Sequence, residues 1–314
     1  MNLVPQAIRG FNYQPSYGST GLELWMRFDA ETIRREIALG KRYFPGMNAI
    51  RLWLSWDAFH RDPQRFLANL ETALAILSTQ DLPVMPVLFN RWHDGHLDYG
   101  GVYVDHFLGR IGGVVRDRAL FDEYVRRVVG EHAADPRIFC WDLCNEPNPI
   151  TEYPAIEQRE LDWLAGLYAQ CKAVGAVAPV TVGSHLGCPV AKVEPFSDWL
   201  SIHPYLFHDT PEGRSAFRAM LDGYVAVARQ AQKPLLATET CWGSLSDQAR
   251  VENARFTLSE LRQRNIGWLV YLLHHSLIAD AHRPEFGPVG APGNLAFIEA
   301  DGTLRPGHSF FNEY

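Results

Sequence analysis

Eight short apolar runs recur along the chain and are mostly separated by segments with helical periodicity. Apolar runs without polar alternation are typical of strands that are buried on both faces, as in a parallel sheet covered by helices. We predict strands at residues 8–13, 48–55, 83–90, 138–143, 179–184, 199–204, 234–239 and 265–273. Regular strand–helix alternation over 314 residues predicts an α/β protein that closes as a (β/α)8 barrel, the TIM barrel.

The intervening segments predict the helical layer of this barrel. Pro63–Gln80 places its leucines on one face, as an amphipathic helix does. Asp29 is a suitable N-cap for a helix that we expect to end at Gly40. Further helices are expected at residues 117–132, 155–174, 211–230 and 246–264, and a short helix or strap in the tail from Asp301. No internal repeat or linker interrupts the pattern, so residues 1–314 are expected to form a single domain.

Composition excludes several classes of partner. The net charge is −7 and no basic run is present, so neither a nucleic acid nor an anionic membrane is expected as a partner. The first residues lack the pattern of a secretory signal, and no apolar stretch reaches the roughly 18 residues of a membrane span. We therefore expect a cytoplasmic protein, with secretion after removal of a signal as the alternative. The five cysteines are odd in number and widely spread, which favours free buried thiols.

Two glutamates stand at predicted strand ends, where barrels of this kind carry their chemistry. Glu146 follows the run 138–143 and precedes Pro147, and Glu239 ends the run 234–239. Two such carboxylates can divide the work of breaking a glycosidic bond: one protonates the leaving oxygen while the other attacks the anomeric carbon. The attacking carboxylate must stay ionised, which a nearby cation such as Arg51 favours. A buried Arg51 must itself be paired, either with this carboxylate or only with a core acid such as Asp142.

Four short motifs together resemble the retaining glycoside hydrolases of clan A, closest to the cellulase- and mannanase-like family 5. They are Leu143-Cys-Asn-Glu-Pro147, Glu239 at its strand end, Arg51 within Ile-Arg-Leu, and His203-Pro-Tyr205. The resemblance covers residues 8–273 and implies a retaining mechanism through a covalent glycosyl-enzyme. The resemblance implies that Glu146 is the acid/base and Glu239 the nucleophile. It implies that Tyr205 hydrogen-bonds the nucleophile and that Arg51 balances its charge. Asn145 would bind the hydroxyl next to the anomeric carbon, and His203 would line the cleavage subsite.

The chain departs from this family pattern in two places. The family usually carries Asp-x-His at the end of the third strand, whereas this chain has Asn90-Arg-Trp-His93, so His93 is the candidate replacement. Where the family commonly places a tryptophan under the sugar on the eighth strand, this chain offers Tyr271. Trp53 and Trp242 are candidate sugar platforms, with core packing as the alternative for both.

We therefore predict a retaining β-glycoside hydrolase that cleaves β-linked oligosaccharides or glycosides and needs neither cofactor nor metal. A transglycosylase with the same site and a carbohydrate-binding barrel without catalysis are the alternatives. A metal-dependent hydrolase is a further rival, because the segment His93-Asp94-Gly-His96-Leu-Asp98 carries possible ligands. The long predicted loops at residues 91–116 and 274–300 favour a partly closed pocket and a soluble substrate.

Overall fold

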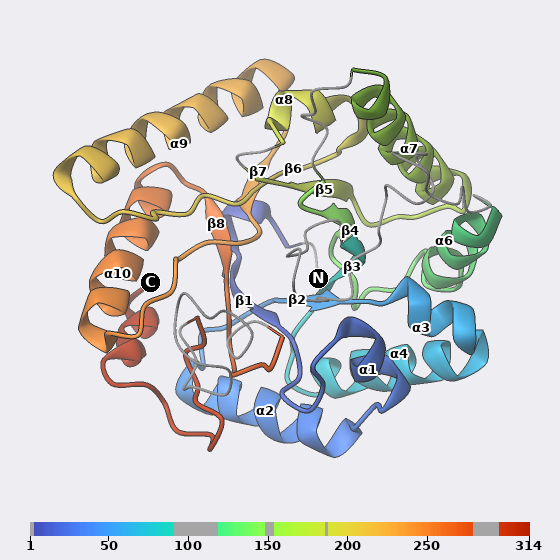
Figure 1. Ribbon diagram of the computed structural model, residues 1–314, viewed down its shortest axis with the longest axis horizontal. Coiled ribbons are helices and arrows are strands. Elements are labelled where there is room, and N and C mark those ends of the chain that lie inside the picture. The colour runs from blue at the N-terminus through green and yellow to red at the C-terminus, as the bar shows by residue number, and fades with distance from the viewer. Residues whose placement is uncertain (1–2, 91–118, 148–153, 186–187, 279–294) are drawn as a thin grey trace.

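The computed structural model describes residues 3–90, 119–147, 154–185, 188–278 and 295–314. Eight parallel strands follow one another in chain order and close on themselves, since β1 pairs with both β2 and β8. Helices form a ring around these strands, as Figure 1 shows in the view down the short axis of the molecule. The predicted (β/α)8 barrel is confirmed.

The strands are short, and all eight lie within or overlap the predicted runs. They are β1 (Arg9–Tyr13), β2 (Ile50–Trp53), β3 (Val84–Asn90), β4 (Trp141–Asn145), β5 (Val180–Ser184), β6 (Leu200–Ile202), β7 (Leu235–Ala237) and β8 (Gly267–Val270).

The helices of the described residues include every helix predicted above, with boundaries that differ by a few residues. They are α1 (Gly21–Met26), α2 (Ala30–Tyr43), α3 (Trp56–Arg61), α4 (Pro63–Ser78), α6 (Ala119–Glu131), α7 (Pro154–Ala173), α8 (Val190–Val193), α9 (Pro211–Ala231) and α10 (Asp247–Gln263), with 3-10 turns η1 (Pro5–Ala7), η2 (Glu194–Phe196) and η4 (His308–Glu313). The short helices α1, α3 and α8 were not predicted, because four to six residues show too little of the helical period.

The predicted end of α2 at Gly40 is wrong. Asp29 caps the helix through bonds from the backbone N–H groups of Glu31 and Thr32, as expected, but the helix continues to Tyr43. Gly40 is buried inside it, and a Cβ at this position would lie 2.9 Å from a methyl group of Leu273. This glycine therefore permits close packing of α2 against the barrel rather than ending the helix.

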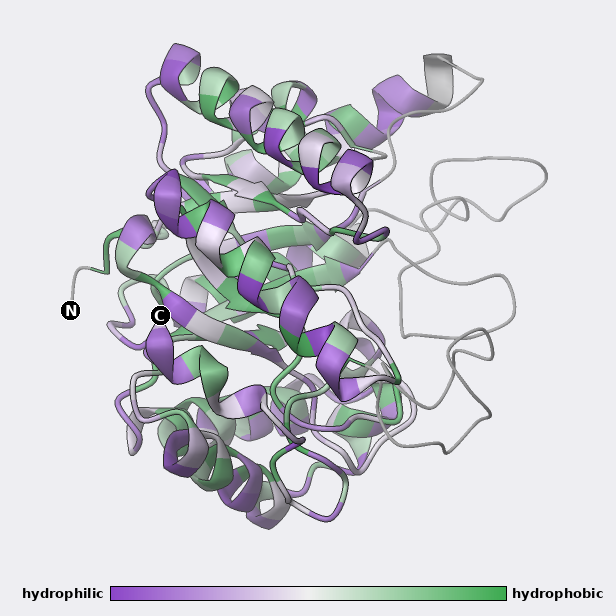
Figure 2. Cartoon of the chain, turned by 90° about the vertical axis from the view of Figure 1, so that its left-hand side faces the viewer, coloured by the Kyte–Doolittle hydropathy of each residue, from purple (hydrophilic) through white to green (hydrophobic). Residues whose placement is uncertain are grey.

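The barrel interior differs between its two ends. At the amino end it is filled by an apolar cluster whose buried members are Ile8, Ala49, Met85, Phe139, Cys140, Leu236 and Leu269. A larger apolar core lies between strands and helices, and Figure 2 shows hydrophobic residues on the strands with hydrophilic residues on the outer faces of the helices. At the carboxyl end the buried inward residues are polar, beginning with Asn12 and Arg51. Polar groups buried at this depth must form hydrogen bonds or ion pairs with one another or with a ligand.

Two further expectations concern the thiols and the tail. All five cysteines are free and buried. The tail forms η4, which buries Phe310 and Phe311 against the core. Among the described residues, no helix combines the length and the apolar character that a membrane span needs.

Candidate active site

Glu146 and Glu239 meet at the carboxyl end of the barrel. Glu146 directly follows β4, and its backbone N–H still donates to the carbonyl oxygen of Gly183 on β5 at 2.9 Å. Its φ of 48° is in the left-handed region, uncommon for a residue other than glycine, where the chain turns out of the strand. Glu239 lies two residues beyond β7. A carboxylate oxygen from each glutamate and a ring nitrogen of His203 all lie within 4.8 Å of one another.

The Glu239 carboxylate is held at both oxygens. Nη1 of Arg51 donates to its Oε1 at 2.5 Å, and the hydroxyl of Tyr205 donates to its Oε2 at 2.8 Å. Burial, followed by the charge of Glu239, raises the pKa of Tyr205 well above its ordinary value, so this phenol remains a donor. Glu239 is only 5% exposed, so its charge is stabilised mainly by these partners rather than by water.

Arg51 forms ion pairs with both Glu239 and Asp142, the two acids that the sequence analysis gave as its alternative partners. Its Nη2 lies 2.7 Å from Oδ2 of Asp142, while Nη1 reaches Glu239. Burial alone would lower the pKa of the guanidinium, but the charges of Asp142 and Glu239 outweigh it and raise the pKa above its ordinary value. The two acids and one cation therefore form a buried network that links β2 and β4 to the segment after β7.

Asn145 is held in one orientation by its neighbours. Its Oδ1 accepts from Nη2 of Arg51 at 2.7 Å, and its Nδ2 donates to Oδ1 of Asn90 at 3.0 Å. Gly183 makes room for this packing: a Cβ there would lie 3.1 Å from Asp142 and 3.2 Å from Arg51. The side-chain amide is thereby held in place before any substrate binds.

His203, the residue that follows β6, contacts both glutamates. Its Nδ1 lies 2.7 Å from Oε1 of Glu146 and 3.7 Å from Oε2 of Glu239. Its Nε2 lies 3.0 Å from the hydroxyl of Thr238. Burial, aided by the charge of Arg51, lowers the pKa of His203 to about 4, although Glu239 acts in the opposite direction. The imidazole is therefore neutral near pH 7.

Aromatic side chains lie on two sides of the glutamates. The rings of Trp53, the last residue of β2, and Tyr271, the first residue after β8, meet edge to face at 6.3 Å. On the β6 and β7 side, Trp242 packs edge to face against Tyr205 at 5.4 Å and against Phe207 at 4.7 Å. Phe207 is 44% exposed, which leaves an apolar ring available at the surface next to the site.

The structure brings nine of the ten predicted site residues to this end of the barrel. Glu146, Glu239, Arg51, His203 and Tyr205 form one contact network with Asn145, while Trp53, Trp242 and Tyr271 stand around it. His93 and the segment 93–98 lie outside the described residues, as do residues 91–116 and most of 274–300.

Several residues of the network were not predicted as part of the site. They are Asn12, Thr238, Gly183 and Phe207, and the sequence indicates Asp142 only as a core acid. A sequence signal existed for Asn12, which stands at the end of a predicted strand. Thr238 directly precedes Glu239, but alternation along a strand does not indicate that its hydroxyl reaches His203.

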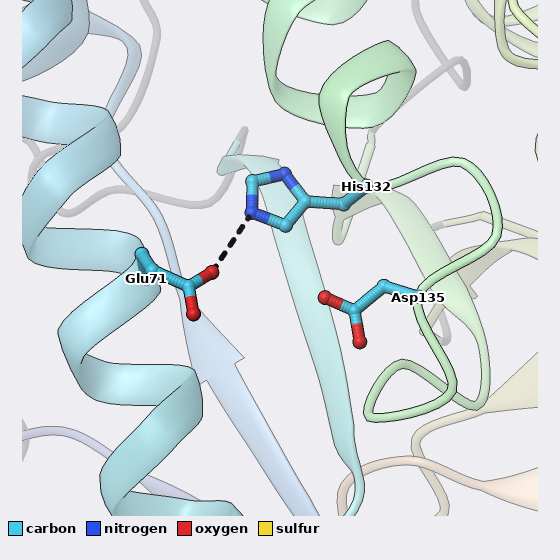
Figure 3. Close-up of side chains that lie close together, drawn as sticks. All are labelled: Glu71, His132 and Asp135. Carbon is cyan, nitrogen blue, oxygen red and sulfur yellow. Dashed lines mark ion pairs between the residues drawn. The ribbon is translucent and has the colours of Figure 1, made fainter.

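A second cluster of possible metal ligands lies away from this site. Glu71 on α4, His132 after α6 and Asp135 face one another, with Nε2 of His132 3.8 Å from Glu71 (Figure 3). Arg137 already binds both carboxylates: it forks onto Glu71 with two bonds of 2.7 Å and lies 2.6 Å from Asp135. This cluster is an ion-pair network that ties α4 to the loop entering β4.

Comparison with known proteins shows what the fold resembles. Neither a protein-family model nor a curated protein matches the chain. Solved structures do: GH5_18 from Streptomyces cattleya in complex with GlcNAc has 17% identity and a TM-score of 0.76, over 100% of this chain and 80% of that one.

Two further structures have similar scores. Exo-β-1,4-mannosidase Op5Man5 from Opitutaceae bacterium strain TAV5 has 19% identity and a TM-score of 0.75, over 97% of this chain and 58% of that one. The hyperthermostable endo-1,4-β-D-mannanase from Thermotoga petrophila RKU-1 has 15% identity and a TM-score of 0.65, over 98% of both chains. The chain therefore shares its fold with structures that include family 5 glycoside hydrolases, the family that its motifs resemble.

Proposed function

We propose that the protein is a retaining β-glycoside hydrolase that acts by double displacement, with Glu239 as nucleophile and Glu146 as acid/base. The observation that carries this proposal is the separation of the two glutamates: a carboxylate oxygen of one lies within 4.8 Å of a carboxylate oxygen of the other. Retaining enzymes hold their carboxyl groups about 5 to 5.5 Å apart, whereas inverting enzymes leave about 6.5 to 9.5 Å for a water molecule. The short separation supports direct attack by one carboxylate.

Their partners distinguish the roles of the two carboxylates. Glu239 is bound by the permanent cation of Arg51, which favours the ionised form that a nucleophile needs. Glu146 contacts the neutral imidazole of His203, so it can exchange a proton without breaking an ion pair to a guanidinium at that oxygen. This asymmetry supports Glu146 as the group that changes its protonation state during the reaction.

In the first step Glu239 attacks the anomeric carbon, and the bond to the leaving oxygen breaks as Glu146 transfers its proton to that oxygen. In the second step Glu146, now ionised, removes a proton from water, and the water oxygen displaces Glu239 and regenerates both groups. Two inversions give net retention. Tyr205 and Arg51 keep their bonds to Glu239 when it departs as a carboxylate, which stabilises the charge that reappears on it.

We propose β-mannosides and short β-1,4-linked oligosaccharides as the first substrates to test. Among the similar structures, one GH5_18 variant from Streptomyces cattleya is complexed with Manb1-4GlcNAc, and two other proteins are an exo-mannosidase and an endo-mannanase. The exposed ring of Phe207 and the partly buried ring of Trp242 that packs against it support a substrate that continues beyond one sugar.

The test is hydrolysis of aryl β-mannoside, β-glucoside, β-galactoside and β-xyloside, together with Manβ1-4GlcNAc and cello- and manno-oligosaccharides. The wild type is compared with Glu239→Gln, and proton NMR of the first product gives its anomeric configuration. We expect one sugar class to be cleaved by the wild type alone, with the β-anomer formed first. A first product of α configuration contradicts the retaining mechanism, and equal cleavage by both proteins contradicts the role of Glu239.

The same experiment addresses the alternatives. Products longer than the substrate would identify a transglycosylase, in which a sugar replaces water as acceptor. Binding of an oligosaccharide by the wild type without turnover of any substrate would favour a carbohydrate-binding barrel.

A further inference from the structure

A chain of hydrogen-bonding side chains runs inward from Glu146 across β6 and β7. Nδ1 of His203 lies 2.7 Å from Oε1 of Glu146, and Nε2 lies 3.0 Å from Oγ1 of Thr238. The Thr238 hydroxyl in turn hydrogen-bonds the hydroxyl of Ser201. His203, Thr238 and Ser201 are at most 2% exposed, so water has little access to these groups. The reaction as described above assigns no role to either hydroxyl.

His203 carries one ring proton near pH 7, because burial lowers its pKa to about 4. Nδ1 faces carboxylate oxygens of both Glu146 and Glu239, at 2.7 and 3.7 Å. A lone pair on Nδ1 would repel these oxygens, so the proton belongs on Nδ1 and the lone pair on Nε2. The charged and titratable groups around the ring are Glu146, Glu239, Asp142, Arg51 and His185.

The tautomer of His203 determines the direction of every bond behind it. Nε2 is an acceptor, so the hydroxyl of Thr238 must donate to it. A hydroxyl has one proton, so the bond between Thr238 and Ser201 must be donated by Ser201. The opposite direction would leave Nδ1 without a proton, and Glu146 would then have to donate its own proton to His203 instead of to the leaving group.

We propose that Thr238, supported by Ser201, is a positioning residue that fixes His203 as a donor to Oε1 of Glu146. Because Oε1 accepts this bond, the proton that Glu146 transfers is carried on its other oxygen, Oε2. The inference rests on the proposed function for its catalytic consequence. The tautomer itself is a property of the folded protein and is testable without any substrate.

The first experiment measures this tautomer by long-range proton–nitrogen correlation NMR of the histidine rings at pH 7. His203→Asn assigns the signals. We expect a protonated Nδ1 and an unprotonated, hydrogen-bonded Nε2 for His203 in the wild type. In Thr238→Val we expect the Nε2 resonance to shift downfield, because the nitrogen lone pair loses its donor. A protonated Nε2 in the wild type overturns the proposal, as does an Nε2 resonance that Thr238→Val leaves unchanged.

The second experiment compares leaving groups in Thr238→Val. We expect kcat/KM to fall about 10-fold or more for an unactivated oligosaccharide, because its leaving oxygen needs a proton. Such a fall is part of the roughly 10²- to 10⁴-fold that general acid catalysis contributes. For a dinitrophenyl glycoside, whose leaving group needs none, we expect a fall of less than about 3-fold. Thr238→Ser keeps the hydroxyl and should restore the wild-type ratio, and Ser201→Ala should give a smaller loss of the same pattern.

Thr181→Val is the matched control, because Thr181 is a buried threonine of β5, the strand next to β6, and its hydroxyl donates to the backbone oxygen of Trp199. Equal losses on both substrates, or a Thr238→Val profile identical to that of Thr181→Val, overturn the proposal. A wild type that cleaves no glycoside contradicts the proposed function instead, and the NMR result then decides the inference alone.

Discussion

Nη1 of Arg51 lies 2.5 Å from Oε1 of Glu239, deep in the barrel, and the side chain of Arg51 is fully buried. The same guanidinium bonds Asp142 at 2.7 Å, so a single cation serves a structural carboxylate and the proposed nucleophile. Because both pairs are buried, loss of the cation leaves two charges without their partner. The network therefore links the stability of the barrel to the proposed nucleophile.

Replacing Arg51 with methionine should affect both properties. We expect a loss of about 3 to 5 kcal/mol in the free energy of unfolding, the cost of removing one partner of a buried ion pair, measured by urea denaturation. Arg51→Lys keeps a charge but cannot fork onto two acids, so we expect a folded protein with kcat/KM lowered about 10-fold or more. Arg137→Lys is the control. Arg137 also bridges two carboxylates, but it lies away from the site, so activity should be unchanged in this variant. Wild-type activity in Arg51→Lys would contradict the role in charge stabilisation.

Azide should distinguish the two glutamates by stereochemistry. In Glu146→Ala the covalent intermediate still forms from a substrate with a good leaving group, and azide should then attack it and yield a β-glycosyl azide. In Glu239→Ala azide should instead fill the space of the nucleophile and yield an α-glycosyl azide. Without azide we expect Glu146→Ala to lose about 10²- to 10⁴-fold in kcat/KM on unactivated substrates. An α-product from Glu146→Ala would mean that the roles are exchanged.

The exposed ring of Phe207 and its partner Trp242 should bind a sugar outside the cleavage site. Phe207→Ala or Trp242→Ala should raise KM for an oligosaccharide about 2- to 10-fold, the value of one aromatic contact, and leave KM for an aryl monosaccharide nearly unchanged. Leu245→Ala is the control, since Leu245 is a 57% exposed apolar residue that follows β7 on the same segment as Trp242. Equal effects of all three variants would remove the case for a sugar platform.

Stability should fall in mild acid because of two buried histidines. The pKa of His203 and that of His308 are both lowered from 6.5 to about 4, in each case first by burial. Between pH 6.5 and about pH 4, these histidines bind protons in the unfolded chain but not in the native protein. The free energy of unfolding therefore has its full value above about pH 6.5 and decreases as the pH falls toward 4. Each histidine contributes up to about 3 kcal/mol to this loss.

His308→Gln tests this without touching the site, since His308 packs against Phe297 near the tail. Urea denaturation at several pH values should show a flatter decline between pH 6.5 and 4 than in the wild type, whatever the change in absolute stability. An unchanged slope would show that His308 titrates alike in both states.

The sequence predicted the architecture better than it predicted the local boundaries. Eight apolar runs are enough to predict the barrel, because a strand that is apolar on both faces must be covered by helices on one face and by the closed barrel interior on the other. The end of α2 was misplaced because Gly40 serves packing against Leu273, a contact between residues far apart in the chain. The helices α1, α3 and α8 were missed because each is too short for its period to show.

For the site, the sequence by itself determined which groups stand at the strand ends, since parallel strands bring all their carboxyl ends to one face. It thereby placed Glu146 and Glu239 together. Only the tertiary structure decided that Arg51 bonds Glu239 and Asp142 at once, and that Thr238 reaches His203. These contacts join residues of different strands and of the segments that follow them. A hydrogen bond depends on distances of tenths of an ångström and on direction, and both are set by barrel closure and strand register, not by the spacing of residues along the chain.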